Sequence, residues 1–150
     1  MDALDPTGPA KDFTTSGDAP VTLQDDLIAL ARTKGRYYTP DPRPEAGSFF
    51  RSDHFPFAKR GVPAVSFGSG EDLVNGGRAA GEAWSKAYNT DRYHQPADEY
   101  DASWNLQGIA QDGDLMTELG RQLANSTTWP SWKEGSEFKA VRDKTAAERK

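Results

Sequence analysis

Apolar residues recur every three or four positions in residues 22–34 and again in residues 105–125. This spacing predicts two amphipathic helices, of which the second is the longest in the chain. Gly35 directly follows the first segment, at the position that glycine commonly takes after a helix. A charged helix is predicted over residues 137–149, a short helix within 49–61 and a short helical turn over 82–88.

Few segments have the pattern of a strand. The apolar and β-branched run Val62–Phe67, ended by Gly68-Ser69-Gly70, predicts a strand buried in a sheet. A short strand is expected at Tyr37-Tyr38, and residues 1–4 resemble the end of another. The Gly-, Pro- and polar-rich stretches between these elements are predicted loops, including residues 5–20, 39–47, 71–81, 91–104 and 129–132.

The alternation of helices and apolar strands predicts an α/β fold with a short, mainly parallel or mixed sheet. A sheet of only two or three strands would leave unpaired edges, or would pair with another chain. A strand end so close to Met1 leads us to expect a piece of a longer protein.

Composition excludes several classes of function. The 150 residues carry a net charge of −5, which argues against a broad surface for nucleic acid or anionic membrane. The absence of cysteine excludes disulfides, thiolate nucleophiles and cysteine-ligated zinc. No apolar run has the length of a membrane span, and the N-terminus lacks the apolar core of a signal peptide.

One of the two histidines, His94, lies in a polar run that contains proline, which is untypical of a protein core. A neutral imidazole is a good zinc ligand, and Asp98 or Asp101 is a candidate to orient its second nitrogen. The alternative is a surface histidine in a turn capped by Asp98. One histidine does not make a metal site, so both interpretations stay open.

The other histidine follows Ser52 and Asp53, an order of residues that suggests a catalytic triad. Adjacent side chains rarely point at one another, so we interpret Ser52 as a helix N-cap. Ser69 lacks the glycine two residues earlier that a nucleophile elbow requires. Asp2 is a carboxylate at a presumed strand end, where ligands gather in α/β sheets.

Two segments together resemble one enzyme family. Residues 51–65, RSDHFPFAKRGVPAV, resemble the S-D-H-x-x-F-x-x-x-G-V-P-A segment of the M28 metallopeptidases. Residues 93–101, YHQPADEYD, resemble the Y-H-x-P-x-D-x-Y-D segment of the same family, and Trp104 and the long helix follow as they do there. The family includes zinc aminopeptidases and is related to glutaminyl cyclases.

The resemblance implies the C-terminal half of a phosphorylase/hydrolase-like α/β/α sandwich. It divides the chain into a partial peptidase domain, residues 1–128, and an aromatic loop with a charged helix, residues 129–150. It implies that His94 is a zinc ligand. Asp2 becomes a second ligand, although Met1-Asp2-Ala3-Leu4 matches the family's N-x-D-M strand end only in part.

The same resemblance implies that Asp53 and His54 border the substrate pocket as catalytic candidates. It adds Phe55, Phe57 and Tyr93 to that pocket. The family's His-x-Asp motif and Glu-Glu pair lie before the strand of the Asp2 type and have no counterpart here. We therefore expect half of a zinc site, completed in a homo-oligomer or by a missing N-terminal half.

These observations favour a hydrolase, a truncated zinc-dependent aminopeptidase that acts on a peptide or a small amide or ester. One alternative is a non-catalytic module that self-associates or binds a partner through its sheet edge. Another is a metal-independent esterase, with Ser52 or Ser69 as the nucleophile and His54 or His94 as the base.

Overall fold

The computed structural model describes residues 4–17 and 20–149. Its centre is a three-stranded mixed sheet of order β2-β1-β3. The strands are β1 (Asp12–Thr15), β2 (Tyr37–Tyr38) and β3 (Phe67–Ser69). The middle strand, β1, is parallel to β2 and antiparallel to β3. Phe13 accordingly pairs with Tyr38 on one side and with Ser69 on the other.

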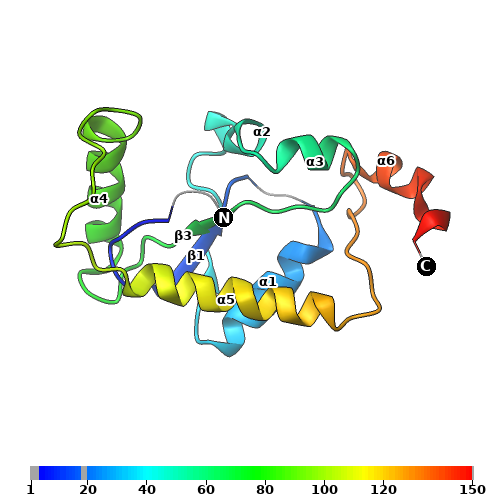
Figure 1. Ribbon diagram of the computed structural model, residues 1–150, viewed down its shortest axis with the longest axis horizontal. Helices are drawn as coiled ribbons and strands as arrows, with labels where there is room; N and C mark the ends of the chain where they lie inside the picture. Colours follow the sequence, from blue (N-terminus) through cyan, green and yellow to red (C-terminus); the bar gives the residue numbers. More distant parts are fainter. Residues whose placement is uncertain (1–3, 18–19, 150) are drawn as a thin grey trace.

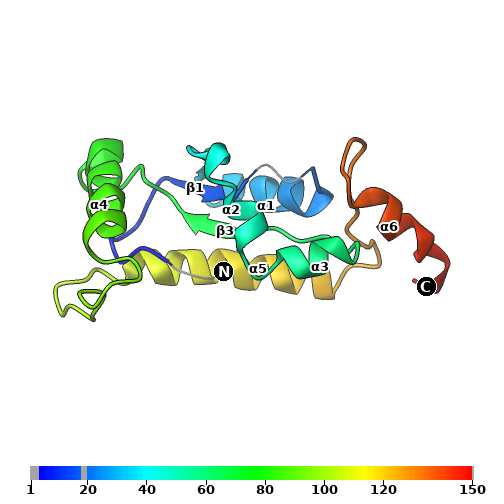
Figure 2. The ribbon, with the colours of Figure 1, turned by 90° about the horizontal axis from the view of Figure 1, so that it is seen from above.

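Helices surround this sheet. They are α1 (Thr22–Thr33), α2 (Ser48–Arg51), α3 (Phe55–Lys59), α4 (Gly77–Asp91), α5 (Gln107–Ala124) and α6 (Lys139–Lys144), with 3-10 turns at Pro44–Ala46 and Ala146–Glu148. α5 runs along the molecule and packs against α1, while α4 stands at one end and α6 at the other (Figures 1 and 2). No described helix has the length and apolar character needed to cross a membrane.

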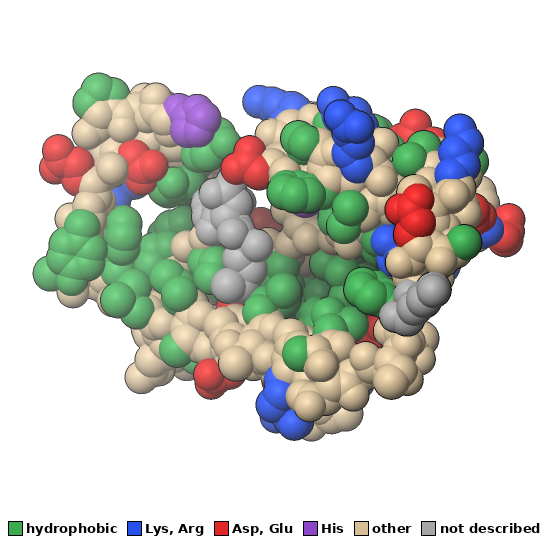
Figure 3. All heavy atoms as spheres, turned by 45° about the vertical axis from the view of Figure 1, so that its right-hand side comes forward, with side chains coloured by type: hydrophobic (Ala, Val, Ile, Leu, Met, Phe, Trp, Pro, Cys, Tyr) green, Lys and Arg blue, Asp and Glu red, His purple; other side chains and the backbone are tan. Residues whose placement is uncertain are grey.

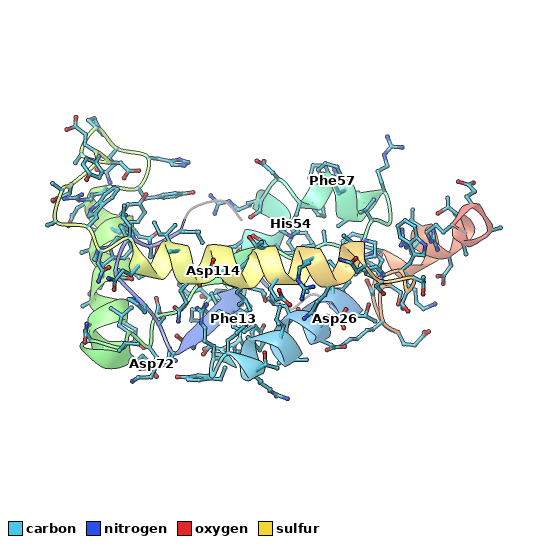
Figure 4. All side chains as sticks on the ribbon, turned by 60° about the horizontal axis from the view of Figure 1, so that its bottom comes forward. Phe13, Asp26, His54, Phe57, Asp72 and Asp114 are labelled. Carbon is cyan, nitrogen blue, oxygen red and sulfur yellow. The ribbon has the colours of Figure 1, made fainter. Side chains whose placement is uncertain are left out.

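The main core lies between the sheet and the two predicted amphipathic helices. Phe13 is fully buried, stacks on Phe67 with ring centroids 5.5 Å apart, and lies between α1 and α5 (Figure 4). The other buried members are Leu27, Leu30, Ala31, Leu115 and Leu119. The apolar positions whose spacing predicted the helices therefore form the face that each helix buries.

A second core cluster joins the C-terminal segment to α2 and α3. Trp132 is 2% exposed, and its indole N–H donates to the carbonyl oxygen of Gly61 at 3.0 Å. The ring of Phe138 stacks on that of Phe49, and Val21 forms an isolated β-bridge with Trp132. Residues 129–138 thus pack against α2 and α3.

The predicted α/β class, the helices α1 and α5 and the short strand β2 are confirmed. The predicted loop over residues 5–20 is wrong where it contains β1. The strand predicted at Val62–Phe67 is largely wrong, because only Phe67 joins the sheet and Val62 is 42% exposed. The C-terminal helix is shorter than predicted, since α6 ends at Lys144.

The largest error concerns α4, which replaces a predicted loop and a short turn. Gly77 and Gly81 lowered the expected helicity of this segment. The structure shows why Gly81 is there: a Cβ at this position would collide with the carbonyl oxygen of Glu71. Close packing on the preceding loop therefore accounts for the glycine, and the helix forms around it.

Candidate functional site

A polar cleft of about 310 Å³ lies where the sheet meets α2 and α4. Several of the side chains that line it carry a charge or a hydroxyl group: Asp5, Ser52, Ser69, Glu71, Arg78 and Tyr93. Residues from distant parts of the chain therefore face one space. Figure 3 shows the molecule hollowed in its middle, with hydrophobic side chains gathered in the hollow.

Asp12, at the start of β1, anchors α4 to the sheet. Its carboxylate is 1% exposed and accepts a hydrogen bond from Arg78 Nη2 at 2.7 Å. Thr39 Oγ1 donates to the same oxygen at 2.8 Å, and the Asp72 N–H donates to the other oxygen at 2.8 Å. The hydrogen bonds that Arg78 makes with Asp12 and Tyr37 raise its pKa above its ordinary value and keep it charged. Both oxygens of the buried Asp12 carboxylate thus have hydrogen-bond partners, one of which is charged.

A second ion pair, buried on both sides, lies beside the first. Arg36 Nη1 donates to Asp112 Oδ1 at 2.7 Å, and both side chains are 3% exposed. Arg36 Nη2 also donates to the carbonyl oxygen of Asp12 at 2.6 Å. Burial raises the pKa of Asp112, while Arg36 and the Ser69 hydroxyl oppose that shift. The two pairs join α4 and α5 to β1.

Asp5 brings a partly buried carboxyl group to the cleft. Burial raises its pKa to about 6, and the charges of Glu71 and Asp112 add to the shift. Its backbone N–H donates to Ser69 Oγ at 3.2 Å. A carboxyl group of this kind exchanges a proton near neutral pH and attracts cations when it is ionised. No sequence motif marks Asp5, and the sequence analysis missed it.

Tyr93 and His94 lie where α4 ends. Tyr93 lines the cleft, its role in a substrate pocket stays a prediction, and the His94 ring stacks on it with centroids 4.0 Å apart. His94 is exposed, and among the described residues it makes no hydrogen bond. Its φ is 57°, the one positive φ that a described non-glycine residue adopts. Such a conformation is uncommon for a residue with a side chain.

The two aspartates predicted to orient His94 bond elsewhere. Asp98 Oδ2 accepts from the Tyr88 hydroxyl at 3.0 Å. Asp101 Oδ1 accepts from the Ser103 N–H at 2.9 Å and from its hydroxyl at 2.7 Å. Within the described part of the chain neither carboxylate forms a hydrogen bond or ion pair with His94, so the orienting role stays a prediction. The predicted ligand Asp2 lies outside the described residues.

The segment with Asp53 and His54 takes a different position. The His54 ring packs edge-on against Phe49 with centroids 4.6 Å apart, next to the second core cluster. Burial lowers its pKa, which keeps the ring neutral at pH 7. Phe57 is 61% exposed on α3 (Figure 4). The residues that line the cleft do not include Asp53, His54, Phe55 or Phe57, so the structure does not bring them to Tyr93.

Ser52 and Ser69 both line the cleft, but their hydroxyl groups are engaged. Ser52 Oγ donates to the carbonyl oxygen of Ser48 at 2.8 Å, at the end of α2, so the N-cap interpretation is wrong. Ser69 Oγ donates to Asp112 Oδ2 at 2.8 Å. In the described ranges neither hydroxyl bonds to a histidine, which leaves the esterase hypothesis without a supporting contact.

The described residues do not by themselves fit a zinc centre. In residues 4–17 and 20–149, no three histidine, aspartate or glutamate side chains are grouped so that they could hold one metal ion. A zinc enzyme uses about three protein ligands and an open position. His94 is an exposed imidazole that stacks on the cleft residue Tyr93 without itself lining the cleft, and it lacks such partners within these ranges.

Comparison with known proteins gives one match. No curated protein and no solved structure matches the chain. The family model described as "Peptidase family M28" matches residues 1–119, which is most of the 150-residue chain and includes every residue of the cleft described above. On this evidence the chain belongs to peptidase family M28.

Proposed function

We propose that this chain is a zinc-dependent peptidase of the aminopeptidase type, with the polar cleft as its substrate-binding surface and His94 as one zinc ligand. Membership of peptidase family M28 supports peptide hydrolysis. The observation that carries the proposal is the placement of His94: it is exposed, without a hydrogen bond to the described residues, and next to the cleft residue Tyr93. Its φ of 57° agrees with a functional constraint on this position.

The proposal requires zinc ligands beyond the described residues, because these do not supply three. Asp2 is the first candidate, from the resemblance. We propose that a second copy of the chain, or another chain, supplies the rest. The catalytic chemistry therefore depends on ligands beyond the described residues.

The cleft suits a polar, extended ligand such as a peptide. The Arg78 side chain is 39% exposed, so part of its guanidinium group remains accessible beside the bonded Asp12. Glu71 and Asp5 add acceptors on the same surface. The ion pair with Asp12 holds Arg78 in place, and such preorganisation lowers the entropic cost of binding.

The test is the zinc content of the purified full chain, measured with hydrolysis of an aminoacyl anilide before and after chelation. We expect bound zinc, hydrolysis that a chelator removes, and recovery when zinc is restored. His94→Ala should lose both zinc and hydrolysis. His54→Asn is the matched control, because it changes the other histidine and should retain zinc.

Two outcomes would contradict the proposal. Hydrolysis that survives chelation would exclude a metal mechanism and favour the serine hypothesis, which Ser52→Ala and Ser69→Ala would then test. A chain that binds no zinc at any protein concentration, and hydrolyses nothing, would favour a non-catalytic binding module. Zinc content that rises with protein concentration would identify a second copy as the source of ligands.

A further inference from the structure

A small aromatic pocket of about 180 Å³ lies next to the polar cleft. Its walls combine four aromatic rings with two carboxyl groups: Trp84, Tyr88, Tyr100, Trp104, Asp5 and Asp98. No part of the proposed peptidase chemistry uses these rings. Asp5 and Tyr88 line both spaces, so the pocket and the cleft share a wall.

Two ring pairs on different segments form the walls. Trp84 and Tyr88 are one turn apart on α4, and their rings stack with centroids 5.1 Å apart. Tyr100 and Trp104 follow α4 in the chain and meet edge to face at 5.5 Å. The Tyr88 hydroxyl donates to Asp98 Oδ2 at 3.0 Å and so links the two walls.

The floor of the pocket is fixed by backbone contacts. The Asn105 N–H donates to the carbonyl oxygen of Pro6 at 3.1 Å, and Thr7 forms a parallel bridge with Asn105. The backbone of Gly8 approaches Gly108 so closely that a Cβ at Gly108 would collide with it. Two of the three segments that line the pocket are therefore held together by backbone contacts, independently of its side chains.

The charge of the pocket favours a cation. The faces of aromatic rings carry negative potential and attract ammonium and guanidinium groups. Two carboxyl groups add to this attraction, and among the described residues that line the pocket there is no lysine or arginine. The net charge of the chain, −5, has the same sign. An anionic ligand would be repelled, and a neutral ligand would gain no Coulomb attraction from the carboxylates.

We propose that this pocket binds the basic side chain of a peptide, lysine or arginine. Its volume, about 180 Å³, suits one side chain, since pockets for whole small molecules usually have about 300 to 1,000 Å³. A peptide that lies in the cleft can place one side chain across the shared wall of Asp5 and Tyr88. The proposal adds a specificity for basic peptides and rests on the proposed function.

Binding is tested by NMR on the full chain labelled with 15N, without any turnover. The probe is n-butylammonium, and n-butanol is its neutral counterpart. We expect the ammonium to shift the indole N–H signals of Trp84 and Trp104, and to leave those of Trp129 and Trp132 in place. We expect it to bind about two- to fivefold more tightly than the alcohol, the range of an exposed cation–π contact.

Trp104→Leu keeps an apolar side chain but removes a ring, so the preference for the ammonium should fall by part of the roughly two- to fivefold that separates the two probes. Trp129→Leu is the matched control, because Trp129 is exposed and lines a different cavity. Asp98→Asn should weaken binding of the ammonium and leave binding of the alcohol unchanged. It offers a second test that keeps every ring.

A tripeptide Gly-Lys-Gly should produce the same shifts, and its Nε-acetylated form should not. Equal affinity for ammonium and alcohol, or shifts centred on Trp129, would overturn the proposal. The result is independent of catalysis. A chain without hydrolysis that still prefers the ammonium would refute the peptidase function alone, and an active chain without the preference would refute the pocket alone.

Discussion

Asp5 is buried against two other carboxyl groups, Glu71 and Asp112, the second of which is paired with Arg36. Its pKa is about 6 in the folded chain, above its ordinary value of 3.8. A carboxyl group with a raised pKa stabilises the folded state below pH 4, and that stability is lost as the pH rises towards 6. The ionised Asp5 therefore costs stability at neutral pH.

Asp5→Asn should remove this cost. We expect the stability of the variant, relative to the native chain, to increase by about 2 kcal/mol between pH 4 and pH 7. Urea unfolding at four pH values measures the difference. Parallel curves for the two proteins would show that the carboxyl group ionises as easily in the folded chain as in the unfolded one.

The buried pair of Arg36 and Asp112 gives a second prediction. Asp112→Ala would leave the Arg36 guanidinium group, 3% exposed, without its carboxylate. Removing one partner of a buried pair costs about 3 to 5 kcal/mol. Glu118→Ala on the same helix breaks an exposed pair with Arg121 and should change stability little. If both variants lowered the denaturation midpoint by a similar amount, the greater contribution of the buried pair would be contradicted.

At the residue scale, Tyr93 stood out from the sequence because it belongs to a motif of nine consecutive positions that resembles one family. The ion pairs were not predictable. Arg36 and Asp112 are 76 positions apart, and Arg78 and Asp12 are 66 apart. No local pattern links such residues, because only the folded sheet brings them together.

Among the elements, α1 and α5 were predictable because each repeats its buried positions at helical spacing. β1 was not, since Asp12 and Thr15 are polar side chains buried by partners from distant segments. The segment Val62–Ser66 has the composition of a strand, yet no strand pairs along it within the described sheet. Composition indicates burial and β propensity, whereas pairing depends on neighbours.

Substitution of two glycines in α5 distinguishes the effect of close packing on stability from the effect of helix propensity. Gly108 faces Gly8, and a Cβ there would collide with its carbonyl oxygen, whereas nothing lies within 4 Å of a Cβ at Gly113. Gly108→Ala should destabilise the chain by about 1 to 3 kcal/mol through overpacking. Gly113→Ala should stabilise it by about 0.5 to 1 kcal/mol. Thermal unfolding should therefore shift in opposite directions, and shifts of the same sign would contradict the close approach of residues 8 and 108.

At the scale of the whole molecule, an apolar groove near the cleft is where we propose that a second copy binds. A groove of about 370 Å³ is lined by Phe49, Phe50 and Phe138, and Phe50 is 56% exposed. Ser48 lines both this groove and the polar cleft. A chain seated in the groove would thus lie beside the cleft, where the proposed zinc centre requires further ligands.

We therefore expect the chain to form a dimer whose stability depends on this groove. Phe50→Ser should shift sedimentation towards the monomer and lower the zinc content at equal protein concentration, because burial of an exposed aromatic side chain favours association. Val74→Ser is the control, since Val74 is 54% exposed and does not line the groove. A monomer that keeps its zinc would show that the remaining ligands come from the same chain, and a dimer unaffected by Phe50→Ser would place the interface elsewhere.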